Sequence, residues 1–221
     1  MTPPRSSPQA RSPARLSRDV LIDACIRIAD REGPEAVTMR RLGAELGVDA
    51  TAVYRHFRDK DELVAATADR LLTDAFDSTT FTGDWRRDIR SAVLTVRRAY
   101  VAHPRIALMV LSATSPMPNE ARVSEATLGI IRRLGLPDRD AVLAFEVLEA
   151  YTVAVSCMDG MGSSGSDAWR LEYAALPPTT FPNLTATATM LYADPDERFE
   201  FGLDLMLDAI ERLVDRHADE A

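Results

Sequence analysis

The sequence predicts an all-α protein. Apolar side chains recur at spacings of three and four along most of the 221 residues, which places them on one face of a helix. The periodic segments begin at residues that can cap a helix and end at glycine or proline. No segment shows the sustained alternation of apolar and polar residues expected of a half-buried strand. We find neither an internal repeat nor a heptad run long enough for a coiled coil.

The composition is that of a soluble globular protein, with 46% hydrophobic and 27% charged residues. A chain of this length can bury a sizeable core and suits one or two domains. Cys25 and Cys157 lie far apart in apolar surroundings, outside any CxxC or Cys/His metal spacing. We therefore expect reduced core thiols in a cytoplasmic protein without a metal site. The N-terminus lacks an apolar signal core and no stretch is long enough to span a bilayer, so we expect no membrane association.

Residues 1–15 are expected to form a disordered arm, because prolines and serines dominate and too little apolar surface is available for folding. Before Asp19 the chain carries Arg5, Arg11, Arg15 and Arg18 and no acid. Two interpretations stay open. The arm is a solvated tail, or it is a basic segment that adds contacts to the phosphates or minor groove of DNA.

Residues 16–76 are expected to form the first domain. Ser17 can cap a helix that runs to about Glu32 and ends at Gly33-Pro34. Its apolar stripe consists of Leu21, Ala24, Cys25, Ile28 and Ala29. This helix is expected to support the segment that follows.

Residues 38–57 have the pattern of two short helices joined by a tight turn. Thr38 can cap the first helix, and Gly47 supplies the positive φ that a helix end needs. Asp49 can cap the second helix, on which Val53 and Phe57 point inward. The side chains left for the other faces are Thr51, Tyr54, Arg55 and His56. The sequence therefore predicts a helix-turn-helix.

A further helix is expected from Lys60 to about Phe76. Asp59 and Glu62 match a capping box at its start. This helix would link the first domain to the rest of the chain. We therefore expect it to transmit a signal between the two domains.

The segment from Thr38 to Lys60 resembles the tetracycline-repressor (TetR) family of bacterial regulators. The likeness consists of Thr38-x-Arg40-x-Leu42-Gly43, Leu46-Gly47-Val48, Tyr54-x-His56-Phe57 and Lys60-x-x-Leu63, and it covers roughly residues 15–76. It implies a three-helix DNA-binding domain, joined by the linking helix to a helical C-terminal domain that binds a small molecule and dimerises. Gly43 departs from the family pattern, where alanine is more usual, and is expected to loosen its helix slightly.

The resemblance also implies which side chains contact DNA. Tyr54 and Lys60 are expected on phosphates, and Arg40 on a base edge. Thr38 is expected mainly to cap its helix and secondarily to contact a phosphate. The residue at the position of Arg55 varies in the family, so the resemblance does not tell which base Arg55 would contact. The full set is Thr38, Arg40, Thr51, Tyr54, Arg55, His56 and Lys60. Without the resemblance, Tyr54 could instead be a buried aromatic residue and Arg40 a solvated one.

The charge distribution agrees with a DNA-binding first domain. The net charge is −8, but residues 1–76 hold 12 basic and 12 acidic residues, and the whole excess lies in residues 77–221. Residues 38–60 hold five basic and three acidic residues. This is a local basic surface on an acidic body. The alternative is that the negative charge only aids solubility.

Residues 77–221 are expected to form a second, helical domain, which begins with a link of small polar residues at 77–83. Asp84 can cap a long helix that His103-Pro104 ends. Further helices are expected at 106–111, 120–134, 138–161, 167–175 and 184–192. Asp194 to Glu197 combine a capping box with proline at the first helical position, and start a last helix that reaches His217.

Two sets of residues are candidates for the functions of this second domain. The candidates for an effector pocket are Trp85, His103, Met109, Met117, Tyr151, Met158, Trp169 and Phe181. Each of them could instead be core, as aromatic and methionine stripes at helical spacing usually are. The candidates for a dimer seam are Val142, Phe145, Leu203, Leu207 and Ile210, on two long helices with wide apolar faces.

We interpret the chain as a ligand-responsive transcriptional regulator, a repressor that binds a palindromic operator as a homodimer until a small molecule releases it. One alternative is a helical small-molecule-binding protein or enzyme with a helix-turn-helix-like head; another is an activator of the same family. An enzyme needs convergent polar groups, and the candidates His103, Glu149 and Asp159 are not linked by a motif. We therefore expect no enzymatic activity and no cofactor. The sequence identifies neither the effector nor the operator.

Overall fold

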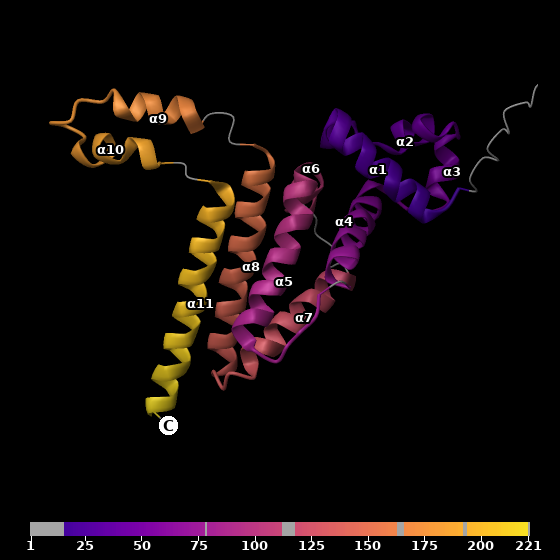
Figure 1. The fold of residues 1–221 in the computed structure, drawn as a ribbon. Coiled ribbons are helices and arrows are strands. Elements are labelled where there is room, and N and C mark those ends of the chain that lie inside the picture. Colours follow the sequence, from indigo (N-terminus) through magenta and orange to yellow (C-terminus); the bar gives the residue numbers. More distant parts are fainter. Residues whose placement is uncertain (1–15, 78, 112–117, 163–165, 192–193, 221) are drawn as a thin grey trace, which may run out of the picture.

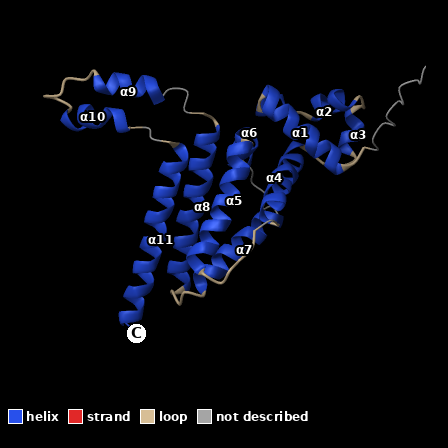
Figure 2. Ribbon diagram, viewed as in Figure 1, coloured by secondary structure: helices blue, strands red, loops and turns tan. Residues whose placement is uncertain are grey.

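The structure is a computed structural model that describes residues 16–77, 79–111, 118–162, 166–191 and 194–220. The described residues form eleven α-helices and two short 3₁₀ helices, without a strand (Figures 1 and 2). This confirms the all-α prediction. The predicted arm, residues 1–15, lies outside the described residues.

The first domain consists of five helical elements. They are α1 (Arg18–Glu32), η1 (Pro34–Ala36), α2 (Met39–Leu46), α3 (Ala50–Tyr54) and α4 (Lys60–Phe76). The caps expected from the sequence are present, because the oxygens of Ser17, Thr38, Asp49 and Asp59 each accept a backbone N–H in the first turn that follows. The helix starts in this domain are thus fixed by contacts within three residues.

The second helix of the motif is shorter than expected. It ends at Tyr54, and the chain then turns while the amides of His56 and Phe57 still donate to the carbonyl of Val53. Val53 and Phe57 are nevertheless both buried, as expected from their spacing. The turn therefore keeps Phe57 in the core although it no longer belongs to a helix.

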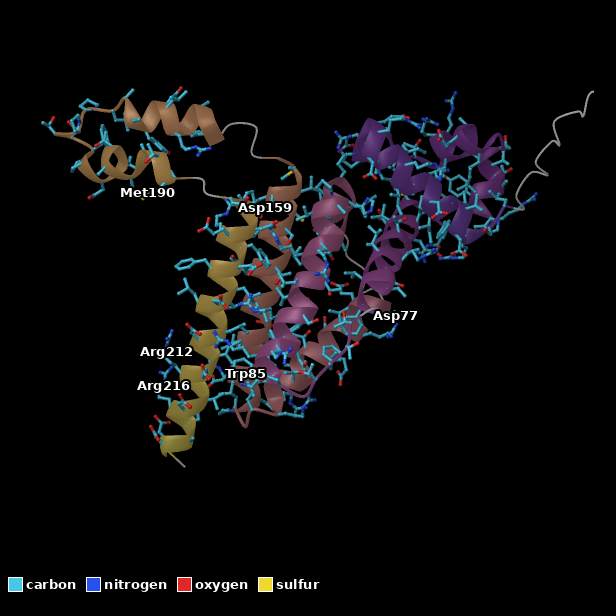
Figure 3. The ribbon with its side chains drawn as sticks, viewed as in Figure 1. Asp77, Trp85, Asp159, Met190, Arg212 and Arg216 are labelled. Atoms are coloured by element: carbon cyan, nitrogen blue, oxygen red, sulfur yellow. The ribbon has the colours of Figure 1, made fainter. Side chains whose placement is uncertain are left out.

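The second domain is a bundle with a projecting hairpin. The bundle contains α5 (Trp85–Ala102), α6 (Pro104–Leu111), α7 (Pro118–Arg132), α8 (Asp138–Gly160) and α11 (Pro195–Glu220). The hairpin contains α9 (Ser166–Ala174), α10 (Pro182–Thr187) and η2 (Ala188–Met190), which pack on one another and extend away from the bundle (Figure 1). Met190 lies in this hairpin, well apart from the other helices (Figure 3).

The hydrophobic core crosses the boundary between the domains. One cluster joins buried residues of α1–α4, such as Leu42 and Leu63, to Tyr100, Ile106 and Cys157 of α5, α6 and α8. A second cluster lies inside the bundle and is centred on residues of α5, α7, α8 and α11. The first domain is therefore packed onto the bundle rather than tethered to it. Cys25 and Cys157 are buried in the first cluster as free thiols.

Two glycines allow helices of the bundle to approach closely. A Cβ at Gly160 would lie 2.7 Å from the Cβ of Pro104 and 3.1 Å from the backbone of Val101, so the end of α8 rests directly on the α5–α6 junction. A Cβ at Gly202 would collide with the hydroxyl of Tyr151, which donates to the carbonyl of Phe199 at 3.0 Å. Close approach, rather than backbone flexibility, explains both glycines.

An ion cluster joins three helices at the end of the bundle nearest the hairpin. The guanidinium of Arg97 on α5 donates to Asp159 on α8 at 2.8 Å and to Asp196 on α11 at 2.7 Å, and lies 4.1 Å from the ring centroid of Phe199. Arg198 also pairs with Asp159, which lies where α8 and α11 approach the hairpin (Figure 3). The side chains of Arg97 and Asp159 are only 5% and 4% exposed.

Helix α8 corrects one expectation. By length and composition alone its 23 residues could cross a membrane, whereas no stretch was expected to be long enough. The helix packs against α5, α6, α7 and α11 and buries Leu148 and Thr152, as a helix inside a bundle does. One side of its apolar surface therefore packs inside the bundle, while another side, with Leu143, Val147 and Met158, faces outward.

Candidate nucleic-acid interface and ligand cavity

The turn between α2 and α3 is tight. Gly47 has a φ of 67°, the left-handed conformation that favours glycine at a helix end. The amide of Val48 donates to the carbonyl of Gly43 at 2.9 Å, and a Cβ at Gly43 would lie 2.8 Å from the carbonyl oxygen of Val48. The lack of a side chain at Gly43 therefore lets the turn close onto α2.

The predicted DNA contacts lie mostly on the outer side of α2 and α3. Thr38, Arg40, Thr51, Tyr54 and Arg55 are exposed, and His56 and Lys60 are half-buried. Tyr54 is 54% exposed, which places its ring in solvent rather than in the core. Its exposure favours the interpretation of Tyr54 as a surface contact over the alternative of a buried aromatic residue.

Intramolecular pairing separates the cations of this surface into two groups. Arg41 donates to Glu32 and Glu45 at 2.7 and 2.8 Å, and the Lys60 ammonium donates to the Pro34 carbonyl at 3.3 Å. Within the described residues, Arg40 and Arg55 make no ion pair or hydrogen bond through their side chains. These two exposed guanidinium groups are therefore available to an anionic partner.

Arg18 has a structural role that the sequence did not reveal. Its guanidinium donates to the His56 carbonyl and to Glu62 at 3.0 Å, and lies 4.1 Å from the ring centroid of Phe57. It thereby ties α1 to the end of α3 and the start of α4. Arg18 therefore starts α1 and turns back onto the domain.

An exposed ion network holds α1 against α2. Hydrogen bonds from Arg41 and then Arg31 lower the pKa of Glu32 from 4.5 to about 2, and the same two arginines lower the pKa of Glu45. The carboxylates therefore stay ionised well below neutral pH. Arg41 is committed to this network, whereas its neighbour Arg40 is not.

This network predicts a pH dependence of stability. Because the pKa of folded Glu32 is about 2 and its ordinary value is 4.5, its contribution is present above about pH 4.5 and is lost as the pH falls toward 2. The difference in Tm between wild type and Glu32→Gln should be largest above pH 5 and vanish near pH 2. Glu35→Gln, an exposed neighbour outside the network, is the control and should give no such trend. A Tm difference for Glu32→Gln that is constant with pH would contradict the prediction.

A largely apolar cavity lies between α4, α5, α7 and α8. It contains about 530 Å³ of space free of protein atoms, part of which is open to solvent. Its lining residues are Leu72, Ala92, Val93, Val96, Tyr100, Glu120, Val123, Ser124, Thr127, Phe145, Leu148, Glu149, Thr152 and Val153. The apolar character of this lining suits a small organic ligand.

The six predicted effector residues whose side chains the structure describes do not line this cavity. Trp85 packs in the bundle core, His103 accepts or donates a hydrogen bond at 3.1 Å to Asp30, and Tyr151 bonds to α11. Three others are exposed, namely Met158 and, in the hairpin region, Trp169 and Phe181. Met117 and the side chain of Met109 lie outside the described residues. The three candidates for catalysis are also apart, since only Glu149 lines the cavity while His103 and Asp159 are paired elsewhere.

The residues predicted for a dimer seam mostly face their own chain. Leu203 and Leu207 are fully buried in the core of their own chain, whereas Ile210, 5% exposed, lines a groove between α8 and α11 together with Leu143 and Val147. Phe145 lines the cavity, and only Val142 is exposed. The large apolar side chains that face outward on α8 and α11 are Val142, Leu143, Val147, Met158, Phe201 and Leu205.

Two contacts connect the cavity region to the DNA-binding domain. Leu72, which lines the cavity, belongs to α4, the helix that starts at Lys60. At the α5–α6 junction, Arg105 donates to the carbonyls of Ala29 and Asp30 at the end of α1. The helix that begins beside the DNA-binding surface therefore forms part of the cavity wall, and α6 is bound to the end of α1.

Two family models match the chain. Residues 21–67, which include the helix-turn-helix, match "Bacterial regulatory proteins, tetR family", and residues 79–214 match "Tetracyclin repressor-like, C-terminal domain". The chain belongs to the TetR family. The second match alone covers more than half of the chain, and the resemblance seen in residues 38–60 is confirmed.

Individual TetR family members are similar over nearly the whole chain. Identity to the HTH-type transcriptional repressor Rv1353c of Mycobacterium tuberculosis is 26%, covering 96% of this chain and 87% of the relative. Identity to the tetracycline repressor protein class A from transposon 1721 of Escherichia coli is 28%, covering 93% and 96%. The solved structure of Streptomyces coelicolor ActR in complex with actinorhodin has a TM-score of 0.77 and 27% identity, covering 89% of this chain and 96% of ActR.

These findings confirm the class of protein. The chain is a ligand-responsive, DNA-binding transcriptional regulator of the TetR family, whose members bind operator DNA, dimerise and bind small molecules.

Proposed function

We propose that this TetR family protein is a cytoplasmic, homodimeric repressor without catalytic activity. It binds a palindromic operator through α2 and α3 of both protomers and leaves the operator when a small molecule occupies the cavity. The observation that carries this proposal is the position of α4. Its first residue, Lys60, lies beside the DNA-binding surface, and its Leu72 forms part of the cavity wall.

The outward apolar stripe of α8 supports the homodimer. Leu143, Val147, Ala150, Ala154 and Met158 are all exposed and recur at helical spacing along the whole helix. On α11 the exposed Phe201 and Leu205 continue this surface, and Arg212 and Arg216 project from the outer side of the same helix (Figure 3). A large exposed apolar surface of this kind is typical of a protein interface.

A two-fold contact through α8 and α11 makes a four-helix bundle in which the same patch serves both subunits. It presents two copies of α3 to DNA. Half-sites about 34–36 Å apart, or a related longer spacing, fit such a dimer.

Arg40 and its neighbour Arg41 allow a matched test of the DNA contacts. Arg40→Ala should relax sequence preference at one base pair, with a loss of about 1–3 kcal/mol of discrimination, because its unpaired guanidinium is free to contact a base. Arg41→Ala should mainly lower stability, because Arg41 is bound to Glu32 and Glu45. Lys60→Ala and Tyr54→Phe should weaken binding to all sequences alike.

Fluorescence anisotropy with operator variants and with random DNA measures these effects. Equal losses on operator and random DNA for Arg40→Ala would exclude a base contact by Arg40.

The release mechanism requires a ligand that binds the DNA-free conformation more tightly than the DNA-bound one. The operator can be found by sequencing the genomic fragments that the purified protein retains, and releasing compounds by screening a library against that complex. Ser124→Phe, which fills the cavity, should abolish release while operator binding persists. Met190→Phe in the hairpin is the control and should leave release intact. Release that survives Ser124→Phe would exclude the cavity as the effector site.

A further inference from the structure

The orientation of α3 depends on what holds its two ends. The helix is only five residues long, and the helix that its backbone mainly approaches is α2. A helix of this length is not stable on its own. Its N-terminal end is fixed by Asp49, whose carboxylate accepts the N–H of Thr51 at 2.8 Å. Its C-terminal end runs into the turn at residues 55–59, which must be held by another part of the domain.

Arg18 of α1 and Glu62 of α4 hold this turn from both sides. The Arg18 guanidinium donates to the carbonyl of His56 and, at 3.0 Å, to Oε1 of Glu62, and it lies 4.1 Å from the ring centroid of Phe57. Oε2 of Glu62 accepts the backbone N–H of Arg58 at 2.7 Å. The hydrogen bonds from Arg58 and then Arg18 lower the pKa of Glu62, so its carboxylate is ionised at neutral pH. We call this pair the Arg18–Glu62 clamp.

The clamp acts next to predicted DNA contacts. Tyr54 and Arg55 are exposed immediately before the clamped turn, and the clamp binds the carbonyl of His56 itself. The side chains of Arg18 and Glu62 are 49% and 35% exposed, and an ion pair this exposed contributes little to overall stability. The clamp therefore affects the orientation of this segment more than the folding of the domain.

We propose that Arg18 and Glu62 are positioning residues for sequence recognition, which set the orientation in which the end of α3 meets the operator. This inference rests on the proposed function, because it takes α3 and the turn after it as part of the DNA-binding surface. Electrostatics alone predicts opposite effects for the two residues: loss of Arg18 would weaken binding to any DNA, and loss of Glu62 would strengthen it. A clamp predicts that both losses weaken operator binding.

Arg18→Ala and Glu62→Ala should each lower the operator affinity of the full-length dimer about tenfold, because a loss of about threefold in each half-site is multiplied over two half-sites. The affinity for a scrambled duplex of the same length should change less than about twofold, since phosphate contacts carry no sequence information. Fluorescence anisotropy measures both, with the operator duplex recovered from the genomic fragments that the protein retains. The Tm should fall by less than about 4 °C.

The same two helices provide matched controls. Arg27→Ala removes a positive charge from an exposed position on α1, and Asp61→Ala removes a negative charge from an exposed position beside Glu62. Both lie outside the clamp and should keep the operator preference of the wild type within about twofold.

Two further variants separate the clamp from its charge. Arg18→Lys keeps the positive charge but lacks the planar fork that donates to two acceptors at once, and should still lose most of the operator preference. It carries the same comparison if circular dichroism shows that Arg18→Ala does not fold. Arg18→Ala combined with Glu62→Ala should lose no more than either single variant, because both residues belong to one clamp.

Three results would overturn the clamp. Equal losses on operator and scrambled DNA for Arg18→Ala would make Arg18 a phosphate contact. Operator binding by Glu62→Ala as tight as that of Asp61→Ala would remove Glu62 from recognition. If both clamp variants bind like the wild type while Arg40→Ala loses base preference, the proposed DNA-binding surface stands and the clamp fails. If Arg40→Ala and Tyr54→Phe leave DNA binding unchanged, the proposed surface itself fails and the clamp with it.

Discussion

Phe201→Asp should give a folded monomer that has lost operator binding, whereas Leu203→Asp, two residues away on α11, should unfold the protein. Phe201 is 66% exposed and belongs to the proposed seam, while Leu203 is fully buried in the core of its own chain. An unpaired charge at Leu203 adds the desolvation of a carboxylate to the loss of a core side chain, which alone costs about 2–5 kcal/mol. That sum is comparable to the whole stability of a typical domain.

The loss of operator affinity for Phe201→Asp is expected to be about 10²–10⁴-fold, because a monomer engages one half-site instead of two. Sedimentation gives the oligomeric state, circular dichroism the folding, and anisotropy the DNA affinity. Val147→Asp on α8 should behave like Phe201→Asp, since Val147 is 60% exposed on the same proposed surface. A Phe201→Asp protein that remains a DNA-binding dimer would refute this seam.

Arg97→Ala should destabilise the protein by about 3–5 kcal/mol, the usual effect of removing one partner from a buried ion pair. Arg97 and Asp159 are both nearly inaccessible to solvent, and Arg97 also holds Asp196 at the start of α11. Among the described residues, the variant leaves Asp159 with Arg198 as its ion-pair partner, and the side chain of Arg198 is 42% exposed. Chemical denaturation measures the change.

A double variant tests whether the effect comes from the unpaired charge. Arg97→Met with Asp159→Leu should recover most of the lost stability, because an apolar pair can replace a buried ion pair without leaving a charge behind. Arg90→Ala is the control, since its pairs with Glu200 and Asp204 lie nearer the surface, and it should cost no more than about 1 kcal/mol. If the loss of stability in the double variant equals the sum of the losses in the two single variants, the side chains of Arg97 and Asp159 are not energetically coupled.

The helices and the DNA-binding motif could be predicted from the sequence because their determinants are local. Ser17, Thr38, Asp49 and Asp59 cap helices through atoms no more than three residues away, and Gly47 fixes the turn by its own backbone conformation. The early end of α3 was not predictable in the same way. Val53 and Phe57 keep the spacing of a helical face and are both buried, although the helix already ends at Tyr54.

The cavity and the dimer surface were harder to predict because they depend on how helices cross. Trp169 and Phe181 were candidates by residue type, but the structure places them on the exposed hairpin. The residues that line the cavity include Glu120 and Glu149, which in the sequence resemble ordinary surface charges. On α11, Phe201 and Leu203 are both apolar, and periodicity alone does not tell which side faces the chain's own core.

The contact at Gly160 has a consequence for the operator itself. The end of α8 touches Val101 and Pro104 without an intervening side chain, and the same junction holds α1 through Arg105. If α8 forms the subunit seam, this close contact is one of the links between the two-fold axis and each DNA-binding domain, beside the packing of α6 on α1 and α4. The separation of the two reading helices is then set partly at residue 160, far from any base. A relative with a bulkier residue there would hold its reading helices at a different separation and would favour an operator of different length.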